Sequence, residues 1–442
     1  MFRLILVLAV AAFGTLASLS SPFNGLLYYM WVAHFRPEAW VWTDLVGNLN
    51  LSLTAGVLTV AATLFGRDRF RFDLRVGLVL LFGVQNLIST LMSPYYKDVW
   101  GPFVDFAKAL TIVCIIPTLV SDLTRFRRVL VVIAVSLGFE GTKQGWAELI
   151  LNPGGQNLNT VAHLGDNNAV AVGMLAVAAI VIALASTATR TWERRLFQFM
   201  FVGLLYRAIS TYSRGGLLAC AGMCLWFLFR SKQRAVAIVG LAFAFLIILP
   251  VLPSEFWERM NTINEARTNL EEADLSILSR LHFWQVAIQM ANKNPILGVG
   301  NFGFNSAYND YDTSNGEFGT NRSVHNSWLG VLSELGYPGL ILYIAQFVLA
   351  FLACARARAA AARGAPKAFV SYAMCLEMSL ISYAVGGTFV ITQYNELLWH
   401  VIGLTIALNM LAMAATNEAG AAPEPVGVDM NGLSNRPVWG AA

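Results

Sequence analysis

Long apolar runs separated by short polar connections dominate the chain and predict membrane-spanning helices. Each run covers about 20 residues, the length that a helix needs to cross the hydrocarbon core of a bilayer. A transmembrane β-barrel would instead show alternating segments of about ten residues. The apolar windows predict twelve spans, near 4–20, 45–66, 74–92, 103–120, 129–150, 167–187, 196–212, 215–229, 235–252, 327–354, 368–391 and 397–415.

Basic residues gather in every second connection, and this pattern predicts the sidedness of the spans. Cytoplasmic connections of membrane proteins carry an excess of Lys and Arg. The basic clusters lie at 67–75, 125–128, 190–195, 230–234 and 356–367. We therefore expect both termini on the cytoplasmic side. Residues 1–20 can alternatively be read as a signal peptide, which would leave the orientation of the other eleven spans unchanged.

Two segments differ from the spans. The long connection 253–326 falls outside the cytoplasm by parity, and its residues 275–292 have the apolar stripe of an amphipathic helix. Residues 417–442, rich in Ala, Gly and Pro, predict a disordered cytoplasmic tail. The predicted organisation is helices one to nine in 1–252, the loop in 253–326, helices ten to twelve in 327–416, and the tail in 417–442.

The composition agrees with an all-α polytopic membrane protein with one long, partly helical loop. Of 442 residues, 57% are apolar and only 13% are charged, about half the charged fraction of a soluble domain. The five cysteines show no paired metal-binding spacing. The net charge of +4 is spread over the connections, without the basic block that a nucleic-acid partner would require.

Two arginines occur where a membrane helix rarely carries charge. An ionisable group at membrane depth costs at least about 2.5–3.5 kcal/mol. Arg207 lies inside the seventh span and Arg214 at its external end, and they share one face if a single helix runs through both. Gly215 and Gly216 then allow a tight reversal with exposed backbone N–H groups. The alternatives are an arginine that extends to lipid phosphates or one held in a structural ion pair.

The same external side carries Arg280, in the predicted amphipathic helix, and His325 with Asn326, where the chain re-enters the membrane. Taken singly, Arg280 fits a solvated residue of a surface helix, and His325 fits a structural histidine. Their common side with Arg214 predicts that the three meet in one cationic site. Arg207 and Asn326 are expected to support it.

Two motifs resemble nucleotide or metal sites without the context these need. Residues 298–303 have GxGxxG spacing, but they follow Asn-Pro-Ile-Leu rather than a buried strand and are predicted to be a loop. Asp310 and Asp312 match the metal-binding DxD of sugar-nucleotide glycosyltransferases, yet they lie on the side opposite to nucleotide sugars. We expect no metal and no cofactor.

Two arginines and one histidine at a membrane boundary suit a lipid-linked phosphate ester. Guanidinium groups match phosphate oxygens in bidentate geometry, and two of them can stabilise a departing pyrophosphate. A neutral imidazole can then take the proton of an acceptor hydroxyl. Repulsion by the arginines lowers the histidine pKa and keeps the imidazole neutral.

These residues carry a resemblance to a known family. The chain resembles the O-antigen ligase and O-antigen polymerase superfamily of inner-membrane glycosyltransferases. The motifs are Ser213-Arg214-Gly215, Arg280 and Trp284 leading to residues 295–300, and His325-Asn326 with Glu334-Leu335-Gly336. Residues 31–42 and 166–168 resemble the exosortase-associated O-glycosylation ligases, although this chain has Pro37-Glu38 where that subgroup often has Pro-His.

The resemblance implies a GT-C-like glycosyltransferase. Such an enzyme transfers an undecaprenyl-pyrophosphate-linked glycan to a hydroxyl of the lipid A core at the periplasmic face, with inversion and without metal. By motif, Arg214 and Arg280 bind the donor pyrophosphate and His325 activates the acceptor. The alternatives are an O-antigen polymerase or a protein O-glycosylation ligase with the same donor, and, from a different class, a transporter or lipid flippase.

Overall fold

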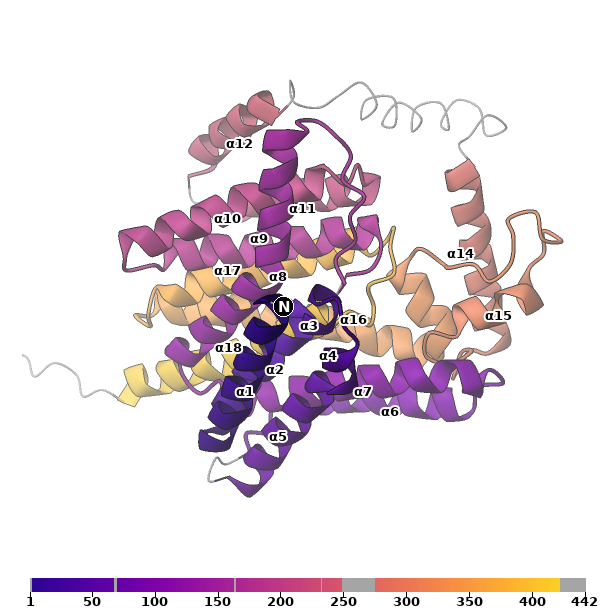
Figure 1. Ribbon diagram of the computed structural model, residues 1–442, viewed down its shortest axis with the longest axis horizontal. Helices are drawn as coiled ribbons and strands as arrows, with labels where there is room; N and C mark the ends of the chain where they lie inside the picture. Colours follow the sequence, from indigo (N-terminus) through magenta and orange to yellow (C-terminus); the bar gives the residue numbers. More distant parts are fainter. Residues whose placement is uncertain (1, 67–69, 163, 232, 249–274, 422–442) are drawn as a thin grey trace, which may run out of the picture.

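Helices form most of the chain in the computed structural model, which describes residues 2–66, 70–162, 164–231, 233–248 and 275–421. Within these ranges the strand-like pairing is limited to one bridge between Val161 and Gly165. The all-α prediction is therefore confirmed. Figure 1 shows several long helices along the longest axis of the molecule. They are α6 (Leu74–Leu91), α7 (Tyr96–Leu119), α16 (Ser327–Ala362) and α18 (Glu396–Ala421).

The N-terminal part is a group of three packed helices, α1 (Phe2–Ser20), α2 (Pro22–Phe35) and α5 (Leu51–Phe65), with short α3 (Pro37–Trp40) and α4 (Leu45–Asn48) between the last two. The sequence pattern did not predict α2. Its 14 residues are fewer than a perpendicular span needs. Pro22 starts it without losing a helical hydrogen bond.

Contacts of Arg3 and Arg36 place the start of α1 within the bundle. The guanidinium of Arg3 lies over the rings of Trp40 and Trp42, so α1 begins beside the segment that leads into α5. Arg36, at the start of α3, pairs with Glu396 at the first residue of α18 at 3.3 Å. The N-terminus therefore lies at the end of the bundle where α18 begins, and α18 leads away from it. Because α2 is shorter than a perpendicular span needs, the predicted cytoplasmic side of both termini stays a prediction.

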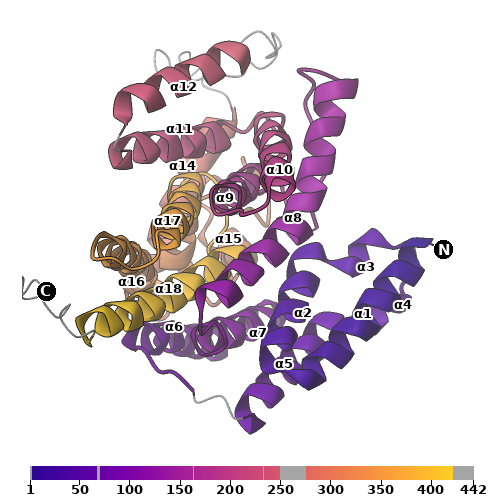
Figure 2. The same ribbon diagram turned by 90° about the vertical axis from the view of Figure 1, so that its left-hand side faces the viewer.

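The centre of the bundle is α9 (Asn167–Ser186), which is buried on nearly every side. Figure 2 shows it enclosed by its neighbours. A helix that is apolar all round fits either the interior of a protein or a lipid-facing span, and the burial of α9 shows that it lies in the interior of the bundle. Hydroxyl groups of Ser379 and Ser382 in α17 donate to backbone carbonyls of α9 at 2.9 and 2.8 Å. The enclosing helices are α8 (Leu123–Leu151), α10 (Thr191–Ile209), α11 (Arg214–Arg230) and α17 (Ala368–Gly386).

Eight helical segments of the described residues are long and apolar enough to cross a membrane. A multi-pass membrane protein is thereby supported, whereas the count of twelve stays a prediction. Helices α8 and α10 carry several charges, α11 has 17 residues, and α12 is described over Arg234–Ile248. The predicted span 45–66 is divided, since Asn50 between α4 and α5 has a φ of 46°.

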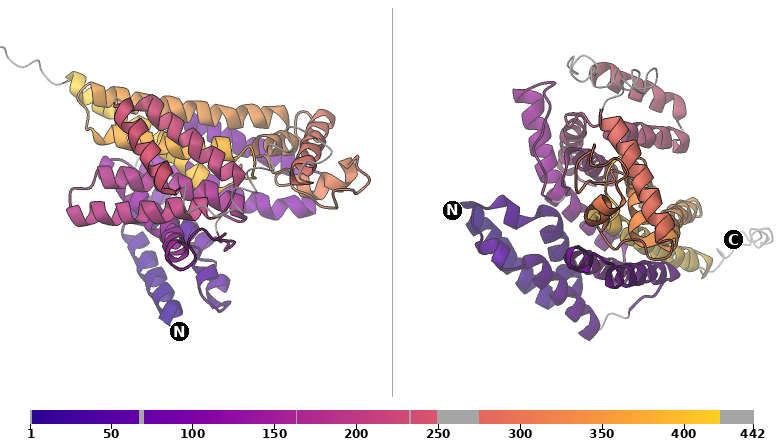
Figure 3. Two further views of the ribbon diagram at one scale, coloured as in Figure 1. Left: turned by 90° about the horizontal axis from the view of Figure 1, so that it is seen from above. Right: turned by 90° about the vertical axis from the view of Figure 1, so that its right-hand side faces the viewer.

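The helix predicted at 275–292 is observed as α14 (Leu275–Lys293), and α15 (Phe304–Tyr311) follows it. Figure 3 shows both at one end of the bundle. The buried face of α14 is formed by Phe283, Val286, Ala287 and Met290, whereas Leu281 and Ile288 of the predicted apolar stripe are exposed. The first part of the predicted loop, 253–274, lies outside the described residues. Helix α18 continues to Ala421, so the prediction of disorder is wrong for residues 417–421. Residues 422–442 of the predicted tail lie outside the described part.

Candidate active site

The chain reverses between α10 and α11 immediately before Arg214. Tyr212 has a φ of 56°, in the left-handed region that residues with a side chain seldom occupy. Ser213 then caps α11. Its hydroxyl accepts a hydrogen bond from the N–H of Gly216 at 3.0 Å and donates to Oδ1 of Asn168 at 2.7 Å. Arg214 is the first helical residue after this cap, so α9 and α11 fix the position of its backbone together.

Arg207 is fully buried in α10, where its guanidinium holds the segment that precedes α9. Its Nε donates to Oε1 of Gln144 at 2.7 Å, and its two Nη atoms donate to the carbonyl oxygens of Asn157 and Asn159. Helix α10 ends at Ile209, so no single helix contains both Arg207 and Arg214. The predicted common face therefore does not exist, and the contacts of Arg207 fit a positioning role.

His325 precedes α16 with a φ of 46°, a second left-handed residue with a side chain. Such backbone costs about 1–3 kcal/mol and tends to gather at functional sites. The adjacent Asn326 is buried and caps α16, because its Oδ1 accepts hydrogen bonds from the N–H groups of Trp328 and Leu329 at 2.9 and 3.1 Å. The predicted supporting residue therefore holds the helix start on which His325 depends.

Residues 387–395, which we call the connecting segment, join α17 to α18 and contact both helix starts. The N–H of Ser327 donates to the carbonyl of Gly387 at 2.6 Å, and its hydroxyl donates to the carbonyl of Val390 at 2.8 Å. At the other helix, a Cβ added to Gly215 would lie 2.9 Å from the Cβ of Phe389. The start of α11, with Arg214, and the start of α16, with His325, thus pack against the same nine residues.

Helix α14 brings Arg280 near His325. The ring of Phe283, one turn beyond Arg280, has its centroid 6.5 Å from that of the imidazole. Burial lowers the pKa of His325 most, the nearby guanidinium groups of Arg280 and Arg322 lower it further, and the carboxylate of Asp166 opposes them. The direction agrees with the expectation that neighbouring arginines keep this imidazole neutral.

The glycine-rich segment at 295–300 packs against the break in α16. The N–H groups of Val299 and Gly300 donate to the carbonyls of Ser333 and Glu334, both at 3.0 Å. Gly336, with φ 69° and ψ −173°, interrupts the helix and leaves room for this contact. The two motifs that were separate in the sequence therefore form one structural unit.

Helix α6 fastens this unit to the bundle from the other side. Nε2 of Gln85 donates to the carbonyls of Ile296 and Leu335 at 2.7 and 2.8 Å. The hydroxyl of Ser89, one turn later, lies 2.8 Å from the carbonyl oxygen of Glu334. Residues 298–303 form a loop, as predicted, and the contacts of Val299 and Gly300 show that this loop packs closely against the backbone of α16.

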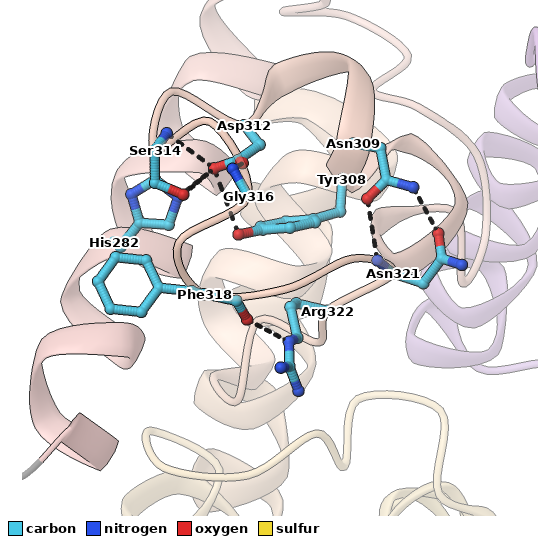
Figure 4. A network of polar contacts seen from close by, with 9 residues as sticks. All are labelled: His282, Tyr308, Asn309, Asp312, Ser314, Gly316, Phe318, Asn321 and Arg322. Carbon is cyan, nitrogen blue, oxygen red and sulfur yellow. Dashed lines mark hydrogen bonds and ion pairs between the residues drawn. The ribbon is translucent and has the colours of Figure 1, made fainter.

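The two carboxylates of the DxD motif have different partners. Asp310 accepts a hydrogen bond from the hydroxyl of Tyr95 at 2.6 Å, whereas Asp312 lies 2.7 Å from Nε2 of His282. Figure 4 shows Asp312 at the centre of a loop network with Ser314. Burial opposes the ionisation of Asp312, but these hydrogen bonds outweigh it and lower its pKa. Among the residues described here, no group of three or more His, Cys, Asp or Glu side chains is placed to bind a metal ion.

Sequence reasoning missed the connecting segment and the link between Ser213 and Asn168. The connecting segment contains no charged residue, so nothing in its pattern marked it as part of a site. The one feature of the sequence that pointed to Asn168 is its place in the Asp166-Asn167-Asn168 sequence at the start of α9. Asp166 caps that helix by accepting from the N–H of Ala169 at 2.8 Å, and its charge acts on His325.

Two family models match the chain. Residues 199–344 match the model described as O-Antigen ligase, and residues 1–213 match a family of unknown function (DUF5935). The first match contains Arg214, Arg280 and His325, and the second contains Asp166 and Asn168. Among curated proteins no match is found.

Proposed function

Since residues 199–344 identify the chain as a member of the O-antigen ligase superfamily, we propose that it is an inner-membrane glycosyltransferase. It transfers an undecaprenyl-pyrophosphate-linked O-antigen polysaccharide to a hydroxyl of the lipid A core at the periplasmic face. One observation carries the proposal: the start of α11 with Arg214 and the start of α16 with His325 pack against the same connecting segment, and α14 brings Arg280 near His325.

In this proposal Arg214 and Arg280 bind the donor pyrophosphate. Each guanidinium offers a planar pair of N–H donors to phosphate oxygens. In the displacement, the bond between the sugar anomeric carbon and the pyrophosphate oxygen breaks, and the charge that develops on that oxygen is stabilised by the arginines. This arrangement supplies the leaving-group stabilisation without a metal ion.

His325 is the proposed general base. A neutral imidazole accepts the proton of the acceptor hydroxyl as its oxygen attacks the anomeric carbon, and the configuration inverts. Burial and neighbouring positive charges lower the pKa of His325 and so favour this neutral form near pH 7. Asn326 and Arg207 support the site by holding the backbone on either side of it.

The same residues serve a polymerase or a protein O-glycosylation ligase, in which only the acceptor hydroxyl differs. Residues 1–213 match a family without an assigned function, so they favour none of the three acceptors. We place the lipid A core first because the matched family is described as a ligase.

The test is transfer by the purified full-length protein, supplied with lipid-linked glycan and either lipid A core, free glycan or a Ser- and Thr-containing protein. We expect His325→Asn to abolish transfer while the protein inserts normally, because Asn tolerates the left-handed backbone better than Ala. Arg214→Lys keeps the charge but loses the planar donor pair, so we expect a large loss of donor use. Arg190→Lys, at the exposed N-cap of α10, is the matched control. Near-normal transfer by His325→Asn would refute the proposed base.

A further inference from the structure

Apart from the site around His325, a concave site lies where the end of α2, helices α4, α5 and α7, and the start of α18 meet. It is a pocket of about 220 Å³, open on one side. Its charged lining residues are Arg36, Glu38, Asp105, Lys108 and Glu396. Asn50 and Ser52 add an amide and a hydroxyl, and Gly47 of α4 forms part of the wall. None of these residues contributes to the site around His325.

The charges in this pocket are arranged in pairs. Arg36 lies 3.3 Å from Glu396 and 3.7 Å from Glu38, and Lys108 lies 2.8 Å from Asp105. Three carboxyl groups face two cations, so there is no excess of positive charge to attract a phosphate. The Nε of Arg36 is buried and makes no hydrogen bond within the described residues. The pocket thus presents donors and acceptors together without a net preference for an anion.

This combination fits a neutral polyhydroxylated ligand. Every hydroxyl of a sugar both donates and accepts a hydrogen bond. A pocket that alternates cationic donors with carboxylate acceptors can therefore bind both sides of each hydroxyl. Pockets for drug-sized ligands have volumes of roughly 300–1,000 Å³. A pocket of about 220 Å³ is smaller and suits one sugar ring rather than a longer chain.

The connecting segment joins this pocket to the proposed active site. Phe389 packs at Gly215, Val390 accepts the hydroxyl of Ser327, and Glu396 follows six residues later in the pocket wall. Six residues span at most about 22 Å. Residues 387 and 390 of this segment contact Ser327, residue 389 packs at Gly215, and Glu396 lies in the pocket wall. Both helix starts of the proposed active site therefore lie within about this length of chain from the pocket.

We propose that this pocket is a binding subsite for one neutral sugar residue of the acceptor glycan. Its assignment to the acceptor rests on the proposed glycan transfer, whereas sugar binding itself does not. Arg36 and Lys108 donate to the sugar hydroxyls, and Glu38, Asp105 and Glu396 accept from them.

Gly47→Trp tests the pocket by filling it. A Cβ added to Gly47 has no neighbour within 4 Å, so the larger residue is introduced without a backbone clash. Gly101→Trp is the matched control, because Gly101 on α7 also has open space around it and does not line the pocket. The full-length protein in nanodiscs is titrated with methyl glucoside, methyl galactoside, N-acetylglucosamine and glucose 6-phosphate, and binding is followed by saturation-transfer NMR.

We expect at least one neutral sugar to bind the wild type and Gly101→Trp, and to bind Gly47→Trp about tenfold more weakly or worse, a loss of about 1.4 kcal/mol. Glucose 6-phosphate should bind less well than the neutral sugars. Asp105→Ala, compared with Asp98→Ala on the same helix, should weaken binding in the same sense. Absence of neutral-sugar binding to the wild type, equal binding by Gly47→Trp, or preference for the phosphate would overturn the proposal.

Transfer assays then separate the subsite from the chemistry. Gly47→Trp should raise the KM for the acceptor glycan and leave the KM for the lipid-linked donor unchanged. An unchanged acceptor KM despite lost sugar binding would overturn the acceptor assignment while the proposed transfer reaction stands. Failure of the wild type to transfer glycan would refute the proposed function and leave the binding result to decide the subsite.

Discussion

Replacing Gly336 by Ala should separate the glycine-rich segment from α16. Gly336 has φ 69° and ψ −173°, a conformation that is essentially restricted to glycine. A Cβ at this position would lie 2.5 Å from the carbonyl oxygen of Pro295. The same carbonyl accepts the N–H of Tyr337 at 2.9 Å, so the clash occurs where the two segments are joined.

The size of the effect follows from two contributions. Strained backbone costs about 1–3 kcal/mol, and forcing extra volume into packed structure costs about 1–3 kcal/mol more. Gly364→Ala isolates the first contribution, because Gly364 has a φ of 104° but nothing within 4 Å of an added Cβ. We therefore expect Gly336→Ala to destabilise by about 2–6 kcal/mol, and Gly364→Ala by only the strain portion.

The measurement is the thermal denaturation midpoint of both variants in detergent, followed by glycan transfer below that midpoint. Gly336→Ala should melt clearly below Gly364→Ala, and its transfer should fall because His325 directly precedes the cap of the same helix. Equal midpoints for the two variants would refute the steric argument. Lower stability with full transfer would refute the link between this contact and the site.

Two further predictions concern His325 and its cap. If neutral His325 is the base, transfer should fall as the pH drops through its pKa, which lies below the usual 6.5. Asp166→Asn keeps the helix cap but removes the charge that raises the pKa of His325. The acidic limb of the pH–rate profile should therefore move to lower pH. A shift to higher pH would contradict the assignment of His325 as the base. Asn326→Ala should destabilise by about 1 kcal/mol through loss of the cap and lower transfer, whereas Asn326→Asp should retain most stability in the same melting experiment. An equal loss of stability in both variants would mean that the side-chain amide of Asn326, rather than its helix cap, stabilises the protein.

The sequence predicted the helical class and the bounds of α14 well, because apolar runs of about 20 residues and helical spacing are strong local signals. It did not predict which face of α14 is buried, since Leu281 and Ile288 are exposed and Phe283 and Val286 are buried. It missed α2, since 14 residues between Ser21 and Arg36 are too short to read as a span. It also missed the break at Gly336, which depends on contact with a segment some 40 residues earlier in the chain.

The residues of the candidate site stay a prediction, and nothing in the sequence pointed to the contacts that hold them. Charge and side could be read from the pattern, and the structure places Arg280 near enough to His325 to act on its pKa. The contacts that hold the site are main-chain contacts of the connecting segment and of Ser327. Backbone carbonyls carry no residue-type signature, so no sequence pattern reports them. Arg207 was correctly singled out as unusual, and only the structure shows that its partners are Gln144 and two carbonyl groups.

The hydrogen bonds from α6 have a consequence for exchanging parts between related ligases. Gln85 and Ser89 hold main-chain oxygens on both sides of the junction between residues 295–300 and α16. A chimera that exchanged only residues 275–326 would combine the loop backbone of the related protein with the Gln85 and Ser89 of this chain. The hydrogen bonds from α6 to the loop would then be lost if the two backbones differ. The loop of residues 275–326 should therefore be exchanged together with the face of α6 that carries Gln85 and Ser89, and with residues 333–337.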